Sequence, residues 1–239
     1  MARTAEVRRN KLDEHSRERR GNISSIPLRA TMEHRERLKR LLRTKSLVRG
    51  TFTLASGKQS EYYLDCKLTT LDPEGAILTG YSILELLAKH DIWPDAMGGP
   101  PIGADPIVTA VAAVSYLEGK PLPAFLIRKE RKPHGRQKQI EGIALKPGLK
   151  VVIVDDVCTA GKSTIEAIAA AEEAGLTVIA VVSLVDREEG GSDRLRQRYP
   201  YYSVFTAREL LEDDSSIEPE VRHTPENTLQ SAPGKSTIA

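Results

Sequence analysis

The stretch from Val151 to Ser163, VVIVDDVCTAGKS, constrains the fold more than any other part of the sequence. Its first four residues are all apolar and do not alternate with polar ones, which predicts a strand buried on both faces. Two adjacent acids follow, and small and hydroxylated residues then lead into an alanine-rich helix that should end before Gly175. A doubly buried strand that runs directly into a helix is typical of a parallel sheet with helices on both sides.

Strand and helix patterns alternate over the rest of the central region. Helices are expected over residues 33–45, 72–90, 105–117 and 163–173, and strands over 52–54, 62–65, 96–98, 124–127, 151–154, 178–185 and 202–205. The predicted fold class is therefore α/β: a twisted parallel sheet flanked by helices, with a small hood made of the N-terminal helix and hairpin. Ligands bind such sheets at the carboxyl ends of the strands, where Asp155 and Asp156 lie.

The sequence divides into a central domain and two polar tails. Residues 1–31 carry many arginines interrupted by acids and are interpreted as a disordered extension. Residues 32–211 form the predicted domain, with the hood contributed mainly by residues 32–70, and residues 212–239 form a disordered acidic tail. We also hypothesise that Met32 is the true start, because helix signals begin immediately after it.

Composition narrows the classes of protein that fit. The formal net charge is only +2, which predicts no general attraction to nucleic acid or to acidic membranes. No apolar run reaches the roughly 18–20 residues of a membrane span, and the N-terminus lacks the apolar core of a secretory signal. Two cysteines, Cys66 and Cys158, are too few for a disulfide framework, so a cytoplasmic location is expected.

The residues after the buried strand suit a phosphorylated sugar. Backbone N–H groups at a helix start, together with the hydroxyls of Thr159 and Ser163, form a cup for a phosphate. The carboxylates of Asp155 and Asp156 can accept hydrogen bonds from vicinal ribose hydroxyls, and the spacing is not that of a Walker loop. The alternative is an ordinary strand–turn–helix connection with solvated capping acids. Cys158 has no visible partner base, so it is interpreted as a small buried residue rather than a nucleophile.

A second chemical segment, Arg128–Lys138, lies between two predicted strands and reads RKERKPHGRQK. Six of its eleven residues are basic and none is aromatic. A solvated surface loop and a nucleic-acid patch are the alternatives, but the second would need aromatic side chains for base stacking. Such a concentration of donors suits a leaving group on which negative charge accumulates.

These segments resemble the type I phosphoribosyltransferases, and more narrowly the orotate phosphoribosyltransferases. Val151–Ser163 matches the motif for phosphoribosyl pyrophosphate (PRPP), and the pattern Arg-Lys-x-x-Lys-x-His-Gly matches the catalytic loop. The resemblance implies the type I phosphoribosyltransferase fold. It assigns PRPP binding to Arg128, Lys129, Lys132, His134, Asp155, Asp156, Val157, Cys158, Thr159, Ala160, Gly161, Lys162 and Ser163.

Within that set, the resemblance implies four catalytic residues. Lys132 is the first choice for stabilising the leaving pyrophosphate, and His134 can donate a proton to it. Asp155 and Asp156 orient the ribose. The resemblance further implies a Mg²⁺ ion held mainly by the substrate, with no dedicated protein ligands, and a homodimer in which the loop closes over the neighbouring subunit's site.

Two further segments resemble the parts of that family that hold the pyrimidine. Residues 52–65 resemble the hairpin that covers the base, where Tyr62 and Tyr63 face either the substrate or a protein core; both alternatives remain open. Residues 186–191, DREEGG, resemble the arginine motif, in which Arg187 is a planar bidentate donor for the carboxylate of orotate.

A surface ion pair of Arg187 with Glu188 or Glu189 is the alternative interpretation of the arginine motif. Thr159, at the start of the phosphate loop, is the remaining residue that we expect beside orotate. The implied function is transfer of the phosphoribosyl group from PRPP to orotate in pyrimidine (UMP) biosynthesis, with no nucleic-acid or membrane partner. A phosphoribosyltransferase for another base and a PRPP-sensing regulatory protein are the alternatives.

The resemblance spans roughly residues 33–211 and has two departures. Residues 98–106 resemble the turn beneath the pyrophosphate, but Ile102 stands where many relatives carry a lysine, and Ala55 stands at another such position. These differences remove two positive charges from the neighbourhood of the substrates.

Overall fold

A computed structural model describes residues 28–53, 59–129, 139–142 and 146–212. Helix α2 (Leu28–Leu41) begins ahead of Met32, whereas most of both predicted tails lies outside the described ranges. The division into a domain and two disordered tails therefore stays a prediction. Within the described residues, no helix is both long enough and apolar enough to cross a membrane.

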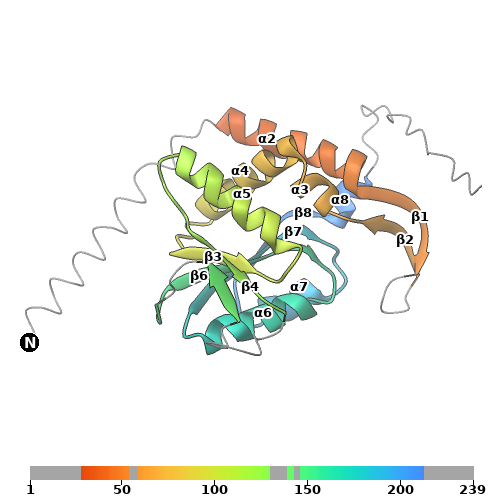
Figure 1. Ribbon diagram of the computed structural model, residues 1–239. Helices are drawn as coiled ribbons and strands as arrows, with labels where there is room; N and C mark the ends of the chain where they lie inside the picture. The colour runs from red at the N-terminus through yellow and green to blue at the C-terminus, as the bar shows by residue number, and fades with distance from the viewer. Residues whose placement is uncertain (1–27, 54–58, 130–138, 143–145, 213–239) are drawn as a thin grey trace, which may run out of the picture.

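Six strands form the central sheet in the order β5-β4-β3-β6-β7-β8 (Figure 1). They are β3 (Ala96–Gly99), β4 (Ala124–Ile127), β5 (Ile140–Gly142), β6 (Lys150–Cys158), β7 (Thr177–Asp186) and β8 (Tyr201–Thr206). Every neighbouring pair is parallel except β4 with β5. The predicted parallel sheet is confirmed, and the antiparallel edge strand β5 was missed because a strand this short carries no readable periodicity.

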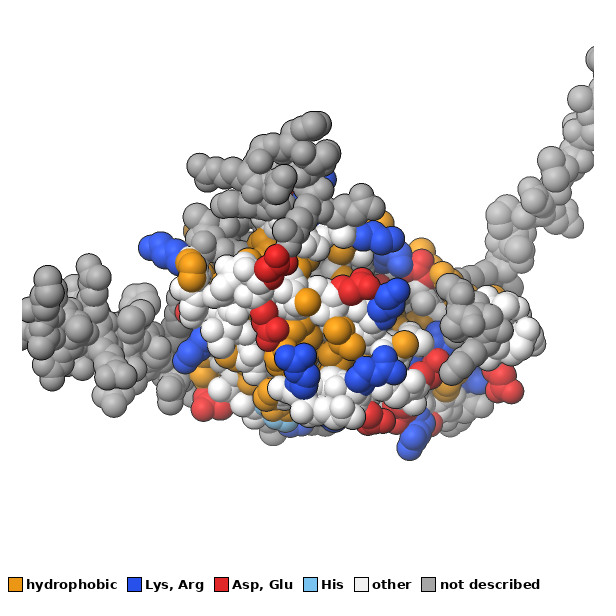
Figure 2. Space-filling view, turned by 90° about the horizontal axis from the view of Figure 1, so that it is seen from below, with side chains coloured by type: hydrophobic (Ala, Val, Ile, Leu, Met, Phe, Trp, Pro, Cys, Tyr) orange, Lys and Arg blue, Asp and Glu red, His pale blue; other side chains and the backbone are white. Residues whose placement is uncertain are grey.

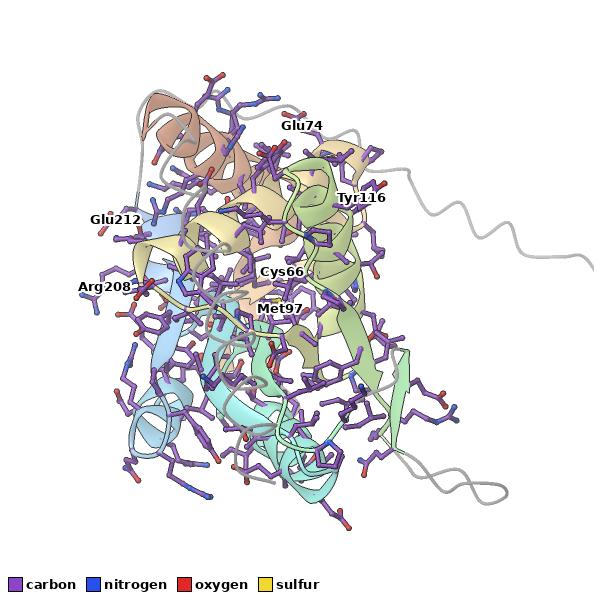
Figure 3. All side chains as sticks on the ribbon, turned by 90° about the vertical axis from the view of Figure 1, so that its left-hand side faces the viewer. Cys66, Glu74, Met97, Tyr116, Arg208 and Glu212 are labelled. Atoms are coloured by element: carbon purple, nitrogen blue, oxygen red, sulfur yellow. The ribbon has the colours of Figure 1, made fainter. Side chains whose placement is uncertain are left out.

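Helices cover both faces of the sheet, as Figure 1 shows. Helices α4 (Pro73–Lys89) and α5 (Ala104–Leu117) lie with α2 on one side, and α6 (Lys162–Glu173) and α7 (Gly191–Arg196) on the other. Alternate residues of β6 serve the two cores: Val152 and Val154 belong to the cluster that includes α4 and α5 side chains, Val151 and Ile153 to the one that includes α6. All four are fully buried, which confirms the strand covered on both faces. Cys66 and Met97 lie inside the first of these cores (Figure 3).

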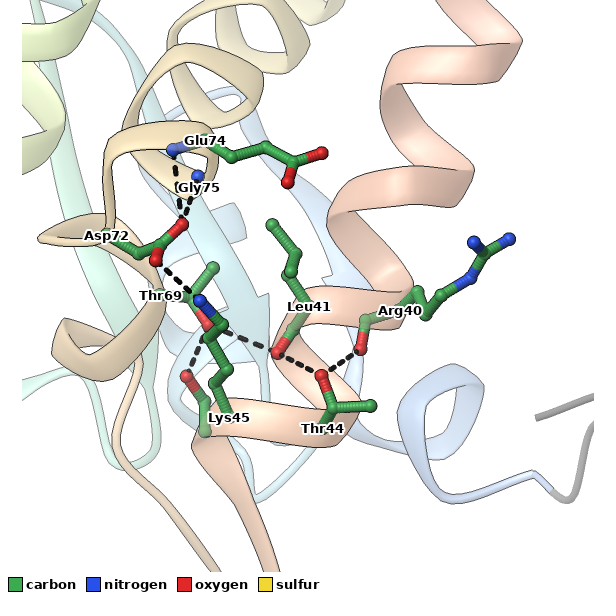
Figure 4. A network of polar contacts seen from close by, with 9 residues as sticks. Arg40, Leu41, Thr44, Lys45, Thr69, Asp72, Glu74 and Gly75 are labelled. Atoms are coloured by element: carbon green, nitrogen blue, oxygen red, sulfur yellow. Dashed lines mark hydrogen bonds and ion pairs between the residues drawn. The ribbon is translucent and has the colours of Figure 1, made fainter. Parts of the chain in front are cut away.

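Helix α4 begins where its sequence predicts. The Asp72 carboxylate accepts hydrogen bonds from the N–H groups of Glu74 (3.1 Å) and Gly75 (3.0 Å), and Pro73 fills the first helical position, where no N–H is needed. Lys45 forms an ion pair with the same carboxylate (Figure 4). The N-cap therefore also anchors the segment that leads into the hairpin.

The hood consists of α2, a π-helical turn η2 (Leu42–Ser46), and the antiparallel hairpin of β1 (Leu47–Thr53) and β2 (Gln59–Leu64). The hairpin is confirmed, and so is the predicted helix over residues 33–45, although its last turn is π-helical because α2 ends at Leu41 and η2 follows directly. In the following turn the Thr44 hydroxyl donates to the carbonyl of Arg40 (2.9 Å), and the Ser46 hydroxyl bonds that of Thr69 (2.6 Å) in α3 (Lys67–Thr70) (Figure 4). Such side-chain bonds compete with the regular α-helical ladder.

The buried strand is longer than the sequence predicted. β6 runs through both acids to Cys158 instead of ending at Val154, because β7 pairs with it as far as Cys158 opposite Asp186. Asp155 and Asp156 are therefore strand residues whose side chains point to opposite faces of the sheet. The short helices α3, α7 and α8 (Ala207–Leu211) were also missed, although α8 begins with a capping box.

Candidate active site

The chemical residues of three strands gather at the carboxyl edge of the sheet. Arg128 follows β4, the acid pair lies near the end of β6, and Arg187 follows β7. The backbone N–H of Arg187 donates to the carbonyl of Cys158 (2.9 Å), and that of Gly191 to the carbonyl of Thr159 (3.0 Å). The arginine segment is therefore fixed to the beginning of the predicted phosphate loop.

Asp155 points into the protein beneath that loop and is only 4% exposed. Its Oδ2 accepts hydrogen bonds from Ser163 Oγ (2.9 Å) and Thr164 Oγ1 (2.8 Å), and its Oδ1 accepts one from the backbone N–H of Asp156 (3.0 Å). Burial, and then the neighbouring charge of Asp156, raise the pKa of Asp155 to about 7, against the opposing effect of the hydroxyls. Asp155 thus holds the first turn of α6 from inside, and the Ser163 hydroxyl expected to bind phosphate is bonded to it.

Asp156 points to the other face of the sheet and keeps a side-chain exposure of 16%. Its Oδ1 accepts a hydrogen bond from the backbone N–H of Val157 (2.8 Å), and its Oδ2 lies 4.0 Å from Nζ of Lys67. Gly103, in the turn after β3, packs against the carboxylate so closely that an added Cβ would lie 2.3 Å from Oδ1. Asp156 is therefore the more accessible acid of the pair, and the missing side chain of Gly103 leaves room for its carboxylate.

The loop between β6 and α6, predicted to bind phosphate, enters the helix through a glycine. Gly161 is the N-cap of α6 in a left-handed conformation (φ 72°). Because glycine has no side chain, it gives no side-chain cap to the N–H groups of the first helical turn. Thr159 is partly exposed, and Lys162 and Ser163 are exposed. Cys158, by contrast, is the buried last residue of β6, and burial raises the pKa of its thiol to about 11. A thiol held protonated in this way is a poor nucleophile.

The Arg187 side chain lies beside the hairpin and is 6% exposed. Its Nε donates to Glu189 Oε1 (2.8 Å), its Nη2 donates to Ser60 Oγ (3.1 Å), and its guanidinium carbon lies 4.4 Å from the centre of the Tyr62 ring. The ion pair considered from the sequence is therefore present, with Glu189; its arginine is buried, whereas Glu189 lies at the surface. Tyr62 is half-buried in this cluster, whereas Tyr63 is exposed. The hairpin and the end of β7 form one polar–aromatic cluster.

The basic segment begins in the described part of the chain and continues outside it. Arg128 and Lys129 are exposed after β4, and Arg128 Nη1 lies 3.4 Å from Glu141 Oε1 in β5. Lys132 and His134 lie outside the described residues, so their predicted roles stay predictions.

Comparison with known proteins identifies the family. Residues 85–220 match the phosphoribosyl transferase domain. The orotate phosphoribosyltransferase of Aquifex aeolicus is 46% identical over 184 residues, which cover 75% of this chain and 99% of that protein. The chain belongs to the orotate phosphoribosyltransferase family.

Solved structures of orotate phosphoribosyltransferases agree with this assignment. The Mycobacterium tuberculosis enzyme in complex with Fe(III) dicitrate is 34% identical, with a TM-score of 0.66 over 75% of this chain and 99% of that one. The same enzyme in complex with PRPP is 33% identical, with a TM-score of 0.62 over 74% and 98% of the two chains. These findings confirm the resemblance, the fold class and the predicted class of enzyme, a pentosyltransferase.

Four residues of this candidate site were missed in the sequence: Ser60, Lys67, Gly103 and Thr164. Thr164 carried a signal, because adjacent hydroxyls at a helix start commonly bond nearby polar groups. Gly103 stands directly before a helix, where a glycine suggests a close backbone approach. Lys67 and Ser60 carried none, since only the packing of the hood brings them to the site.

Metal ligands and surface charge complete the description of the site. Within the described ranges, no three or more His, Cys, Asp or Glu side chains are grouped so that they could hold a metal ion. The face covered by α6 and α7 mixes acidic and basic side chains around hydrophobic ones (Figure 2).

Proposed function

We propose that this protein transfers the 5-phosphoribosyl group of PRPP to orotate, giving orotidine 5′-phosphate and pyrophosphate in UMP biosynthesis. The bond from C1 to pyrophosphate loosens first, through an oxocarbenium-like transition state. A ring nitrogen of orotate then forms the new bond to C1, and pyrophosphate leaves with the bonding electrons and takes up the proton that the nitrogen releases. The hydrogen bond from the Arg187 N–H to the Cys158 carbonyl carries the proposal, because it joins the predicted orotate-binding arginine to the PRPP motif.

PRPP would bind along the end of β6 and the start of α6. The backbone of Thr159–Ser163 receives the 5′-phosphate, with the helix start supplying N–H donors and a favourable dipole. Asp156 accepts hydrogen bonds from the ribose hydroxyls. Asp155 acts from inside, because its bonds to Ser163 and Thr164 fix the turn that forms the cup. Asp155 is thus a positioning residue in this proposal, and Asp156 is the acid that meets the sugar.

Orotate would lie between Arg187, the hairpin and Thr159. The guanidinium of Arg187 is planar and already oriented by Tyr62 and Ser60, so it loses little freedom on meeting the substrate carboxylate. Tyr62 offers an aromatic face at the same place, whereas Tyr63, the next residue of β2, points to the opposite face of the hairpin, where its ring lies 5.7 Å from that of Phe52. A guanidinium suits the carboxylate of an acidic pyrimidine better than it suits a neutral purine.

The basic segment would bind the leaving group. Arg128 and Lys129 stand at its beginning, exposed at the carboxyl edge of the sheet, and Lys132 and His134 follow in sequence. Positive charge here stabilises pyrophosphate as it departs, with Lys132 placed first and His134 as a proton donor. Mg²⁺ would be held mainly by PRPP and water rather than by dedicated protein ligands, and it would supply positive charge against the phosphates.

A homodimer is part of the same proposal. Large apolar side chains are exposed on α3 and at its C-cap, in the turn after β3 and on α5, namely Leu68, Leu71, Ile102, Tyr116 and Leu117. Because α3 and α5 contact each other, these side chains can form one apolar surface, and a contiguous exposed apolar surface favours a protein–protein interface. Tyr116→Glu should therefore lower the mass in sedimentation equilibrium from that of a dimer to that of a monomer. An unchanged dimer mass would show that this surface is not the dimer interface. The cytoplasmic location stays a prediction.

Arg187→Met tests base selection. Losing a charge-assisted pair with the orotate carboxylate should raise KM for orotate about 30-fold or more, by the ~2 kcal/mol such a pair contributes. The matched control is Arg208→Met, which removes an exposed arginine paired with Glu188. Equal KM values for the two variants would refute the role of Arg187.

The alternatives are tested with the wild-type protein. Uracil, adenine and hypoxanthine run beside orotate test a phosphoribosyltransferase for another base. PRPP binding without turnover of any base would favour a PRPP-sensing regulator.

A further inference from the structure

Lys67 occupies a position that the proposed reaction does not yet use. It is the first residue of α3, directly after the hairpin, and its side chain is 39% exposed. Its Nζ lies 2.7 Å from Asp65 Oδ1 and 4.0 Å from Asp156 Oδ2. Asp65 also caps the backbone N–H of Lys67 through the same Oδ1 (3.1 Å), so the start of α3 is fixed relative to β2.

The charges around Lys67 make it more than a surface lysine. Asp155 and Asp156 are adjacent acids, and the ion pairs formed within the described residues bring one cation, Lys67, to Asp156. The hydrogen bond with Asp65 raises the pKa of Lys67, so the ammonium stays charged at any pH at which the protein works. An acid pair that must bind a polyanionic sugar diphosphate needs such a cation beside it.

The position of Lys67 also relates it to the turn after β3. Oδ2 of Asp156 faces Lys67, and Oδ1 of the same carboxylate is the atom against which Gly103 packs. Lys67 and that turn therefore border one carboxylate. The distance of 4.0 Å to Asp156 is longer than a hydrogen bond, and an ammonium has three donors of which Asp65 needs one. The head group can thus keep Asp65 and still reach a ligand beside Asp156.

We propose that Lys67 is a PRPP-binding residue whose ammonium, held by Asp65, contacts the diphosphate of PRPP and balances the charge of Asp156. This inference rests on the proposed function, since it names a further contact of the same site. Lys67 acts on PRPP and not on orotate. A neutral side chain at this position should weaken PRPP binding selectively.

The test is a comparison of Lys67→Met with Lys67→Arg, assayed for KM of both substrates and by calorimetric titration with Mg²⁺ and PRPP in the absence of orotate. Lys45→Met is a closely matched control, because Lys45 is also a partly exposed lysine paired with an aspartate, Asp72, in the hood. Thermal melting of each variant reports on folding.

The proposal predicts a rise of about tenfold or more in KM and Kd for PRPP in Lys67→Met, with KM for orotate within about twofold of wild type. Lys67→Arg should recover most of the loss, and Lys45→Met should bind PRPP as wild type does. PRPP binding by Lys67→Met that equals wild type, or falls no further than in Lys45→Met, overturns the proposal. The titration decides this even if the wild-type protein does not turn over orotate, an outcome that would refute the proposed function instead.

Discussion

Thr164→Val tests the structural role of Asp155, the buried acid of the pair. Thr164 is 1% exposed, and its hydroxyl donates to Asp155 Oδ2 at 2.8 Å. Valine has nearly the same shape and the same β-branched stiffness, so the substitution removes one hydrogen bond and little packing. The backbone of α6 should stay in place.

The magnitude follows from the charge state of Asp155. A hydrogen bond to an ionised group contributes about 1.5–3 kcal/mol to stability, and one between neutral groups about 1 kcal/mol. Because the pKa of Asp155 is raised to about 7, the side chain is largely ionised at pH 8 and protonated at pH 5. We therefore expect Thr164→Val to lower the free energy of unfolding by about 2 kcal/mol at pH 8 and by about 1 kcal/mol at pH 5.

The sign of the pH effect follows from linkage. The pKa of Asp155 lies above its ordinary value of 3.8, so its contribution to stability is present at low pH and is lost as the pH rises through 7. The Thr164 hydroxyl favours the charged form and limits that loss. Removing it raises the pKa of Asp155 further, which deepens the loss at high pH.

Urea unfolding at pH 5 and pH 8 measures this difference. The control is Thr109→Val, which removes an exposed hydroxyl bonded to the Asp105 carbonyl at the same 2.8 Å. Its cost should be below about 0.5 kcal/mol and should not change with pH. Equal costs for Thr164→Val and Thr109→Val at pH 8 would refute the role given to Asp155.

Three further predictions concern the site and the hood. Gly103→Ala should displace the Asp156 carboxylate, because the new Cβ would lie 2.3 Å from Oδ1, and steady-state kinetics should show KM for PRPP raised several-fold with melting little changed. Glu189→Gln should lower KM for orotate several-fold, because the bond at 2.8 Å neutralises Arg187 before the substrate carboxylate arrives. Arg35→Met should cost about 1–2 kcal/mol in urea unfolding, since its guanidinium links α2 to Val204, Phe205 and Glu209.

Each of these has its own control. An unchanged KM for PRPP in Gly103→Ala would show that Asp156 can move without loss. Glu188→Gln serves beside Glu189→Gln, because Glu188 pairs with Arg208 instead, and equal effects of the two would remove Glu189 from base recognition. Arg37→Met, which breaks an exposed pair with Glu74, should cost less than about 0.5 kcal/mol and thereby calibrate Arg35→Met.

The sequence predicted the parallel sheet because the four consecutive apolar residues of β6 require a strand that is buried on both faces. It did not predict which acid faces inward. The predicted strand ended at Val154, so the alternation of side chains was not extended to the acids. In the structure it continues: Asp155 lies on the same face as Val151 and Ile153, and Asp156 lies on the face of Val152 and Val154. The extra length comes from pairing with β7, which no local pattern of β6 reports.

Site residues could be predicted where a recognisable motif lies at the end of a predicted strand. Site residues that the hood contributes could not be predicted. Arg187 stands at a strand end in a recognisable motif. Its partner Ser60 and the lysine beside Asp156, Lys67, come from the hairpin and the short helix after it, far away in sequence. Their approach depends on how the hood packs on the sheet, which is set by contacts such as those of Arg35 with Val204 and Glu209.

The most direct test of the whole account is the stoichiometry of a single reaction of the wild-type protein. Orotate absorbance and released pyrophosphate are followed together after mixing the protein with orotate, PRPP and Mg²⁺. The account predicts that one pyrophosphate appears for each orotate consumed. Orotate absorbance and pyrophosphate should both stay constant when Mg²⁺ is chelated, and no pyrophosphate should be released when uracil replaces orotate. Unchanged orotate and pyrophosphate in the complete mixture, with PRPP bound, would contradict it.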